Sequence, residues 1–218
     1  MNYAPPLADN RFLLLEVLQA PAQLRPAAGE ENTDPQLLEQ VLEEAARFVG
    51  GVVAPLRAVG DQPGCRFEAG RVTTPPGFRE AYQSFWQAGW PALACQPEDG
   101  GQGLPAVLEG VLYEWLSAAN HGWTMAPGLL HGAYECLRHH ASDDLKSAWL
   151  PKVASGEWLA TMCLTEPHAG SDLGLVRTRA TPQADGSHRV SGTKIFISGG
   201  EHDLTENIGH LVLARLAD

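Results

Sequence analysis

The chain has 218 residues and a formal net charge of −11; 44% of its residues are hydrophobic and 19% are charged. This composition predicts a folded globular protein and not a disordered one. The excess of acidic residues argues against a broad electrostatic grip on nucleic acid or on anionic lipid.

Targeting and redox features restrict the class of protein further. No uninterrupted apolar run is long enough to span a bilayer, and residues 1–10 lack the basic patch and apolar segment of a signal peptide. The cysteines are scattered and include no C-x-x-C pair, so we expect free, buried thiols and not a disulfide or zinc set. A cytoplasmic location is the default expectation.

The first part of the chain has the periodicity of helices. Asp9 begins a short expected helix that reaches Gln19, whereas residues 21–32 are expected to form a loop because they contain prolines and a glycine. Asp34 and Pro35 are residue types of a helix N-cap and of a first helical position. The expected core-facing residues of that helix are Leu37, Val41, Ala45, Phe48, Val52 and Leu56.

The helical pattern continues after a polar, turn-rich excursion at residues 60–76. Aromatic side chains recur on one face of the next helix, which is typical of core packing and not of a cofactor site. Pro151 and Gly156 are expected to end the helical part. The helices expected in this part cover residues 77–88, 104–119 and 126–139 and a segment that begins at Ser142.

From Trp158 onward the period becomes two, as in β-strands. The first expected strand alternates so that Trp158, Ala160, Met162 and Leu164 share one face. Further strands are expected over residues 176–181, 194–198 and 211–216, with a tight turn at Asp185-Gly186. The chain is therefore predicted to be α+β, with an all-helical domain at residues 1–157 and a β domain at residues 158–218.

The change of period coincides with an unusual stretch, Met162-Cys163-Leu164-Thr165-Glu166-Pro167-His168-Ala169-Gly170-Ser171-Asp172. Proline stops the strand because it has no N–H to donate and restricts the residue before it. The small, polar residues that follow allow the backbone to approach a ligand closely. Such a loop suits an anion or a flat cofactor at a strand end, but its chemistry alone favours a polar turn.

Two segments resemble a known family. The stretch from Met162 to Asp172 resembles the flavin-binding signature of acyl-CoA dehydrogenases, and Gly192-Thr193-Lys194-Ile195-Phe196-Ile197-Ser198-Gly199-Gly200 resembles their second flavin-contacting strand. The run through Arg215 is most similar to the subgroup that includes 3-methylmercaptopropionyl-CoA dehydrogenase. The resemblance implies a helical N-terminal domain followed by part of an antiparallel β-barrel, truncated before further strands and a C-terminal helical domain.

The resemblance also implies FAD as the cofactor and assigns roles to residues. Met162 and Leu164 would lie against the isoalloxazine ring, and Thr165 would bind its pyrimidine edge. Phe196 would stack at the ring and Ser198 would hydrogen-bond near N5. Gly170 and Ser171 would approach the pyrophosphate, and Ser171 also the coenzyme A arm of the substrate. The family has an aromatic residue at position 162, tryptophan at 196 and threonine at 198; each substitution here keeps an apolar surface or a donor.

The implied reaction removes a proton α to an acyl-CoA thioester while a hydride passes to the flavin, and an electron-transfer flavoprotein is the implied acceptor. Family members take the base, a glutamate, from the C-terminal helical domain. We therefore expect no catalytic residue in this chain, and Glu166 is expected to be structural. A homo-oligomer would follow only from a full-length chain.

Other functions, and other roles for the same residues, are also compatible with the sequence. A non-catalytic remnant or interaction module could keep the fold and lose the chemistry, and the acyl-CoA dehydrogenase relatives of DNA-damage responses are disfavoured by the net charge of −11. Taken singly, Met162, Leu164 and Phe196 could be core residues, and Thr165 and Ser171 could be turn hydroxyls. The histidines show no zinc pattern, so we expect no metal site and no nucleic-acid partner.

Overall fold

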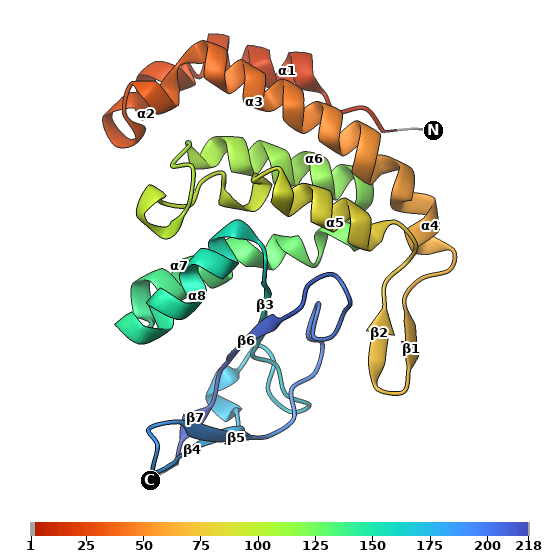
Figure 1. The fold of residues 1–218 in the computed structure, drawn as a ribbon, viewed down its shortest axis with the longest axis vertical. Helices are drawn as coiled ribbons and strands as arrows, with labels where there is room; N and C mark the ends of the chain where they lie inside the picture. Colours follow the sequence, from red (N-terminus) through yellow and green to blue (C-terminus); the bar gives the residue numbers. More distant parts are fainter. Residues whose placement is uncertain (1–2, 218) are drawn as a thin grey trace.

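The computed structural model describes residues 3–217, which stack in layers from the first helices to the last strands (Figure 1). Helices α1 and α3 form one end, α5 and α6 the middle, and α7 and α8 cover the strands. The helices are α1 (Leu7–Arg11), α2 (Ala20–Ala28), α3 (Pro35–Phe48), α4 (Arg57–Asp61), α5 (Phe78–Gln87), α6 (Ala106–Thr124), α7 (Leu130–His140) and α8 (Asp143–Ser155), and short 3-10 or π-helical turns η1 to η8 join or extend them.

The start of α3 confirms the predicted cap, because the Asp34 side chain accepts a hydrogen bond from the backbone N–H of Gln36. Its predicted buried face is wrong by about one position. The fully buried side chains are Leu38, Leu42, Ala45, Val49 and Val53, whereas most of the predicted set is only partly buried. The reason is that α3 packs against both α1 and α6, so its apolar stripe is wider than a single face.

A helix stands where a loop was expected. Residues 20–28 form α2, with Pro21 in its first turn, where a proline costs no hydrogen bond. Pro151 likewise lies inside α8, which continues to Ser155. The expectations that residues 21–32 form a loop and that Pro151 ends the helical part are therefore wrong, because neither proline ends its helix.

The middle of the helical part is an aromatic core. Tyr82 and Phe85 of α5 lie against Trp123 of α6, and the Phe85 and Trp123 rings meet edge to face with centroids 5.5 Å apart. The aromatic stripe of α5 is therefore core packing, as predicted. Helix α6 extends beyond its predicted end and is broken at Asn120, whose φ and ψ are −156° and 82°.

The excursion after α4 is a β-hairpin, in which β1 (Arg66–Glu68) pairs with β2 (Arg71–Thr73) in antiparallel register. The hairpin is fastened to the last part of the chain, because the Asp203 carboxylate accepts hydrogen bonds from Thr74 N–H at 3.0 Å and Thr74 Oγ1 at 2.6 Å.

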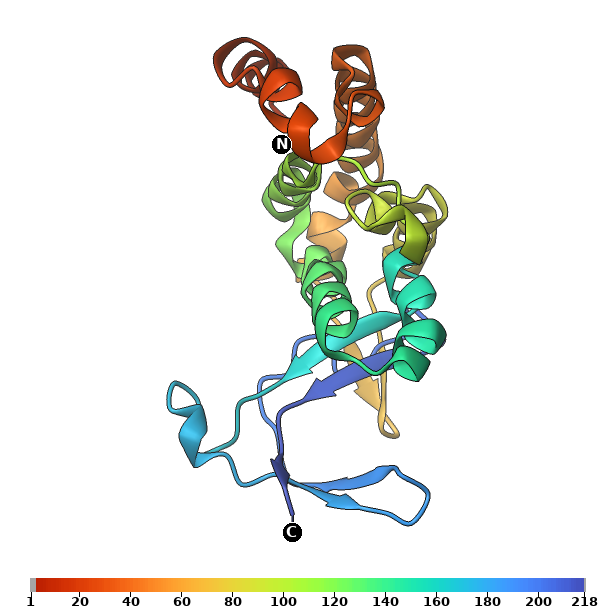
Figure 2. The same ribbon diagram turned by 90° about the vertical axis from the view of Figure 1, so that its left-hand side faces the viewer.

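The last part of the chain contains two small sheets, which lie beneath α7 and α8 (Figure 2). One pairs β3 (Leu159–Cys163) with β6 (Ile208–Val212), and the other has the order β5-β4-β7. The strands of the second sheet are β4 (Arg179–Pro182), β5 (His188–Ser191) and β7 (Arg215–Leu216). The mixture of helices and small sheets confirms the predicted α+β class.

The strand pairing differs from the expected antiparallel barrel. Among the described strands after α8, β3 pairs with β6 in parallel, β4 pairs with β7 in parallel, and β4 pairs with β5 in antiparallel register. The described residues form no closed barrel. The expected strand at residues 194–198 is also wrong, because Phe196 has a φ of 57° and the residues after it form a turn around Gly199, with a φ of 65°.

Candidate functional site: an apolar trough beside a polar turn

A concave trough of about 440 Å³ lies between α7 and the β3–β6 sheet. Its helix side is formed by small residues, Gly128, Gly132 and Ala133, which leave room above the strands. The strand side is apolar. The full lining is Gly128, Leu129, Gly132, Ala133, Cys136, Thr161, Met162, Leu164, Leu211, Val212 and Leu213. Apolar walls with a few polar groups at one end are typical of sites for organic ligands.

The alternation of β3 exposes one face of the strand to this trough. Leu159 and Cys163 are buried on the opposite face, whereas Met162 is 57% exposed. Leu164 follows on the same side as Met162 and also lines the trough. Two of the predicted cofactor-contacting residues are thus brought together on an open apolar surface.

The β3–β6 sheet is held against the helices at the start of β3 and at Gly209 of β6. Gly156 ends α8 with a φ of 81°, and its carbonyl accepts a hydrogen bond from the Tyr82 hydroxyl at 2.5 Å. Gly209 of β6 lies under Trp149 of α8, since a Cβ at Gly209 would come within 2.7 Å of that ring. The floor of the trough is therefore fixed to the helical part.

A tight turn follows β3, and Thr165 lies directly before it. Glu166 and Ala169 exchange backbone hydrogen bonds of 2.8 and 3.1 Å, which close the turn. Gly170 and Ser171 come next and are exposed, so their backbone is open to a ligand. Thr165 itself is half-buried, and its methyl group faces Gly170.

The side chain of Glu166 is buried and points back into the fold. Its carboxylate accepts hydrogen bonds from the Thr178 hydroxyl, from the backbone N–H groups of Arg177 and Thr178, and from the Lys194 ammonium. These donors hold the pKa of Glu166 well below its usual range, the Thr178 hydroxyl contributing most. Glu166 is fully used by the protein, as expected of a structural residue.

The second predicted segment lies beside the first without forming a strand. The backbone N–H of Ile195 donates to the Thr165 carbonyl at 2.9 Å. Phe196 projects with 89% of its surface exposed, and Ser198 is half-buried in the following turn. Neither residue lines the trough, and the strand expected to carry both is absent because the backbone turns at Phe196.

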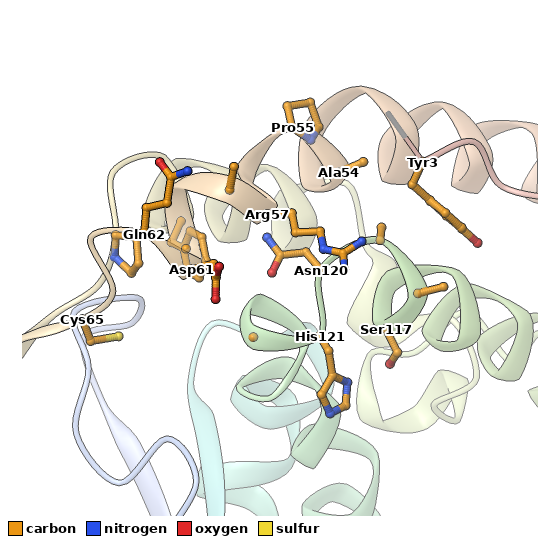
Figure 3. A pocket seen from close by; sticks show the side chains of 17 residues that line it. Tyr3, Ala54, Pro55, Arg57, Asp61, Gln62, Cys65, Ser117, Asn120 and His121 are labelled. Atoms are coloured by element: carbon orange, nitrogen blue, oxygen red, sulfur yellow. The ribbon is translucent and has the colours of Figure 1, made fainter. Parts of the chain in front are cut away.

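A larger groove of about 870 Å³ lies elsewhere, between α4, the end of α6 and Tyr3 (Figure 3). Its lining is polar, with Arg57 and Asp61 from α4 and Ser117 and His121 from α6. None of the predicted cofactor-contacting residues lies in it. Size alone therefore does not identify the functional site.

The comparisons with known proteins match this architecture. Residues 36–157 match the family model described as acyl-CoA dehydrogenase, N-terminal domain. The chain belongs to the acyl-CoA dehydrogenase family. It is 43% identical over 218 residues to 3-methylmercaptopropionyl-CoA dehydrogenase of Ruegeria pomeroyi, which agrees with the predicted subgroup; all of this chain and 37% of that protein are covered.

Solved structures of acyl-CoA dehydrogenases share the fold. Glutaryl-CoA dehydrogenase from Mycobacterium smegmatis superposes with a TM-score of 0.66 at 25% identity, over 82% of this chain and 42% of that one. An acyl-CoA dehydrogenase complexed with FAD from Bacillus anthracis superposes with a TM-score of 0.59 at 22% identity, over 74% of this chain and 27% of that one. The chain thus spans less than half the length of these relatives.

Some features of the site were not predicted from the sequence. The helix wall of the trough was missed, although the spacing of Gly128 and Gly132 by four residues would place both on one helical face. The contact between Lys194 and Glu166 was missed as well, and no local pattern indicates it. Within residues 3–217, no group of three or more histidine, cysteine, aspartate or glutamate side chains could hold a metal ion.

The cysteines are free, as expected, but Cys65 and Cys136 are exposed and only Cys95 and Cys163 are buried. No helix in the described part of the chain is long and apolar enough to cross a membrane.

Proposed function

We propose that this chain forms the wall of an FAD and acyl-CoA thioester site, as part of an enzyme that dehydrogenates the α,β bond of the thioester. The observation that carries the proposal is the open apolar face of Met162 and Leu164, which runs directly into the turn at Thr165. A flat, apolar ring with one polar edge fits this combination. The proposed reaction class, α,β-dehydrogenation of a thioester, is inferred from membership of the acyl-CoA dehydrogenase family.

The residues of the turn fit FAD chemically. Ser171 is exposed, and Thr165 and Ser198 are half-buried, so a ligand can reach these three hydroxyl residues. In the proposal, Thr165 binds the pyrimidine edge of the ring, and Gly170 and Ser171 receive the pyrophosphate. Phe196 is exposed, as a residue that stacks on a ligand would be.

Bound FAD would supply the two-electron acceptor of the reaction. The chain's own part is binding and orientation: Met162 and Leu164 exclude water from one face of the ring, and Ser198 donates a hydrogen bond near its reactive edge. No carboxylate lines the trough among the described residues. The proposal therefore assigns no proton-abstracting base to the trough lining.

The identity of the acyl substrate and of the electron acceptor is part of the same proposal. The 3-methylmercaptopropionyl-CoA dehydrogenase relative supports a sulfur-containing or medium to long acyl thioester as substrate. The electron acceptor is proposed to be an electron-transfer flavoprotein. Membership of the family supports both assignments.

A flavin titration tests the proposal. FAD is titrated into the purified chain, and quenching of its fluorescence and the change in its visible bands are followed. We expect saturable binding that Thr165→Ala with Ser198→Ala weakens by about tenfold or more, because two hydrogen bonds at about 1 kcal/mol each are lost. The matched control is Thr181→Ala with Ser191→Ala, two exposed hydroxyl residues of the β4–β5 hairpin.

The proposal is overturned if the wild-type chain takes up no FAD either alone or together with the C-terminal part of the Ruegeria pomeroyi relative. That result would leave a non-catalytic module that keeps only the fold.

A further inference from the structure

Glu166 joins three separate parts of the chain through one carboxylate. It belongs to the turn after β3, it accepts N–H groups of Arg177 and Thr178 at 2.8 and 2.9 Å, and it receives the Lys194 ammonium at 2.9 Å. His168 Nε2 lies 3.4 Å from its second oxygen. Its side chain is 3% exposed, so these contacts are shielded from water.

Lys194 makes a second contact that defines its role. Its ammonium also donates to the Leu164 carbonyl at 2.8 Å, and the Lys194 side chain is 9% exposed. Leu164 and Glu166 are the two neighbours of Thr165. One cation therefore contacts both neighbours of Thr165, the residue that faces the proposed pyrimidine edge of FAD: the backbone carbonyl of Leu164 and the side-chain carboxylate of Glu166.

No strand pairing fixes the segment around Lys194. Residues 192–197 have no regular secondary structure, and the backbone contact of this segment with the turn is the Ile195–Thr165 hydrogen bond. Gly192 packs against Thr178, where a Cβ would come within 2.2 Å of the threonine hydroxyl. Side-chain contacts to Glu166 thus replace the ladder that a strand would provide.

A buried ion pair is weak evidence for a gain in stability, because desolvation offsets the attraction, whereas it is well suited to fix one arrangement of the chain. We propose that Lys194, through Glu166 and the Leu164 carbonyl, is a positioning residue that sets the distance between the two FAD-contacting segments. This inference rests on the proposed function. Lys194 acts through the turn and does not itself touch FAD.

The first test needs no cofactor. Hydrogen exchange of the Ile195, Arg177 and Thr178 amides is compared between the wild-type chain and Lys194→Met. We expect exchange at these amides to accelerate by about tenfold or more, because a buried carboxylate is left without its cation. Lys152→Met is the control: it removes a partly exposed lysine that is paired with Glu157 at 2.6 Å and does not line the trough, and it should leave these amides unchanged.

The second test measures the affinity for FAD and the spectrum of bound FAD. We expect Lys194→Met to weaken binding by about tenfold and to alter the visible absorption and circular dichroism of bound FAD. Lys194→Arg, which keeps the charge and can use the hollow beside Lys194, should restore binding and spectrum. A change in overall stability alone would not shift the spectrum of the bound ring.

The outcomes distinguish a failure of the positioning role of Lys194 from a failure of the proposed function. If wild-type chain binds FAD and Lys194→Met binds it with the same affinity and spectrum, the positioning role is overturned while the proposed function stands. If the wild-type chain binds no FAD, either alone or together with the C-terminal part of the Ruegeria pomeroyi relative, the proposed function and the cofactor role of Lys194 both fail. If Lys194→Met does not fold, Lys194→Met with Glu166→Gln removes the unpaired charge, and wild-type FAD binding by that variant would also overturn the inference.

Discussion

Glu166 illustrates how one residue serves several parts of the fold. Its carboxylate accepts four hydrogen bonds, and its pKa is held below the usual range by the Thr178 hydroxyl, the backbone N–H groups of Arg177 and Thr178, and Lys194. A carboxylate with a depressed folded-state pKa contributes stability above its unfolded pKa, which is about 4.3. That contribution is lost as the pH falls through the folded-state value.

The pH dependence of unfolding tests this assignment. Glu166→Gln should lower the urea midpoint at pH 7, and the difference from wild type should shrink as the pH falls from about 4.3 downward. Urea unfolding at pH 7, 4 and 3 measures it. A difference that stays constant with pH would show that the ionised form of Glu166 is not what the fold stabilises.

At the scale of secondary-structure elements, the junction between α8 and β3 fixes where the first strand of the trough begins. Gly156 takes a left-handed conformation that the fold requires, with Pro91 and Trp86 packed around it. A Cβ at Gly156 would lie 2.5 Å from Pro91 Cγ. The close approach and the positive φ both demand glycine.

Gly156→Ala should therefore lower the free energy of unfolding by about 2–4 kcal/mol, from left-handed strain and overpacking together. Gly110→Ala is the control, because Gly110 is helical and a Cβ there meets nothing within 4 Å. That variant should be neutral or more stable by up to about 1 kcal/mol. Denaturant unfolding of both variants measures the change in the free energy of unfolding. An equal change in the two variants would contradict the role of Gly156.

In the whole molecule, the trough exists only because the helical part and the sheets pack together. Gly132→Leu should fill it and weaken FAD or acyl-thioester binding by about tenfold or more while the chain stays folded. A Cβ at Gly132 meets nothing within 4 Å, and the trough offers space for the rest of the leucine side chain. Gly110→Leu makes the same change on α6, away from the trough.

Ligand titration and circular dichroism are the measurements for this pair. Undiminished binding by Gly132→Leu would show that the ligand lies elsewhere. Loss of binding in both variants would point to a general effect of the leucine and not to the trough.

Part of the fold could be predicted from local pattern. The capping by Asp34 and the aromatic core face of α5 depend on neighbours in the sequence, and both are confirmed. The loop expected at residues 21–32 failed because a proline in a first helical turn was treated as a breaker. The roles of Thr165, Gly170, Ser171 and Ser198 toward FAD stay predictions.

The sequence by itself determined most of the helices, the cap of α3, the alternation of β3 and, through two short motifs, the family. Only the tertiary structure decided that β3 pairs in parallel with β6, that α7 closes the trough, and that Lys194 reaches Glu166. Periodicity reports which face of an element is apolar, because it depends on residues a few positions apart. It carries no information on which distant segment covers that face, since this depends on packing across the whole chain.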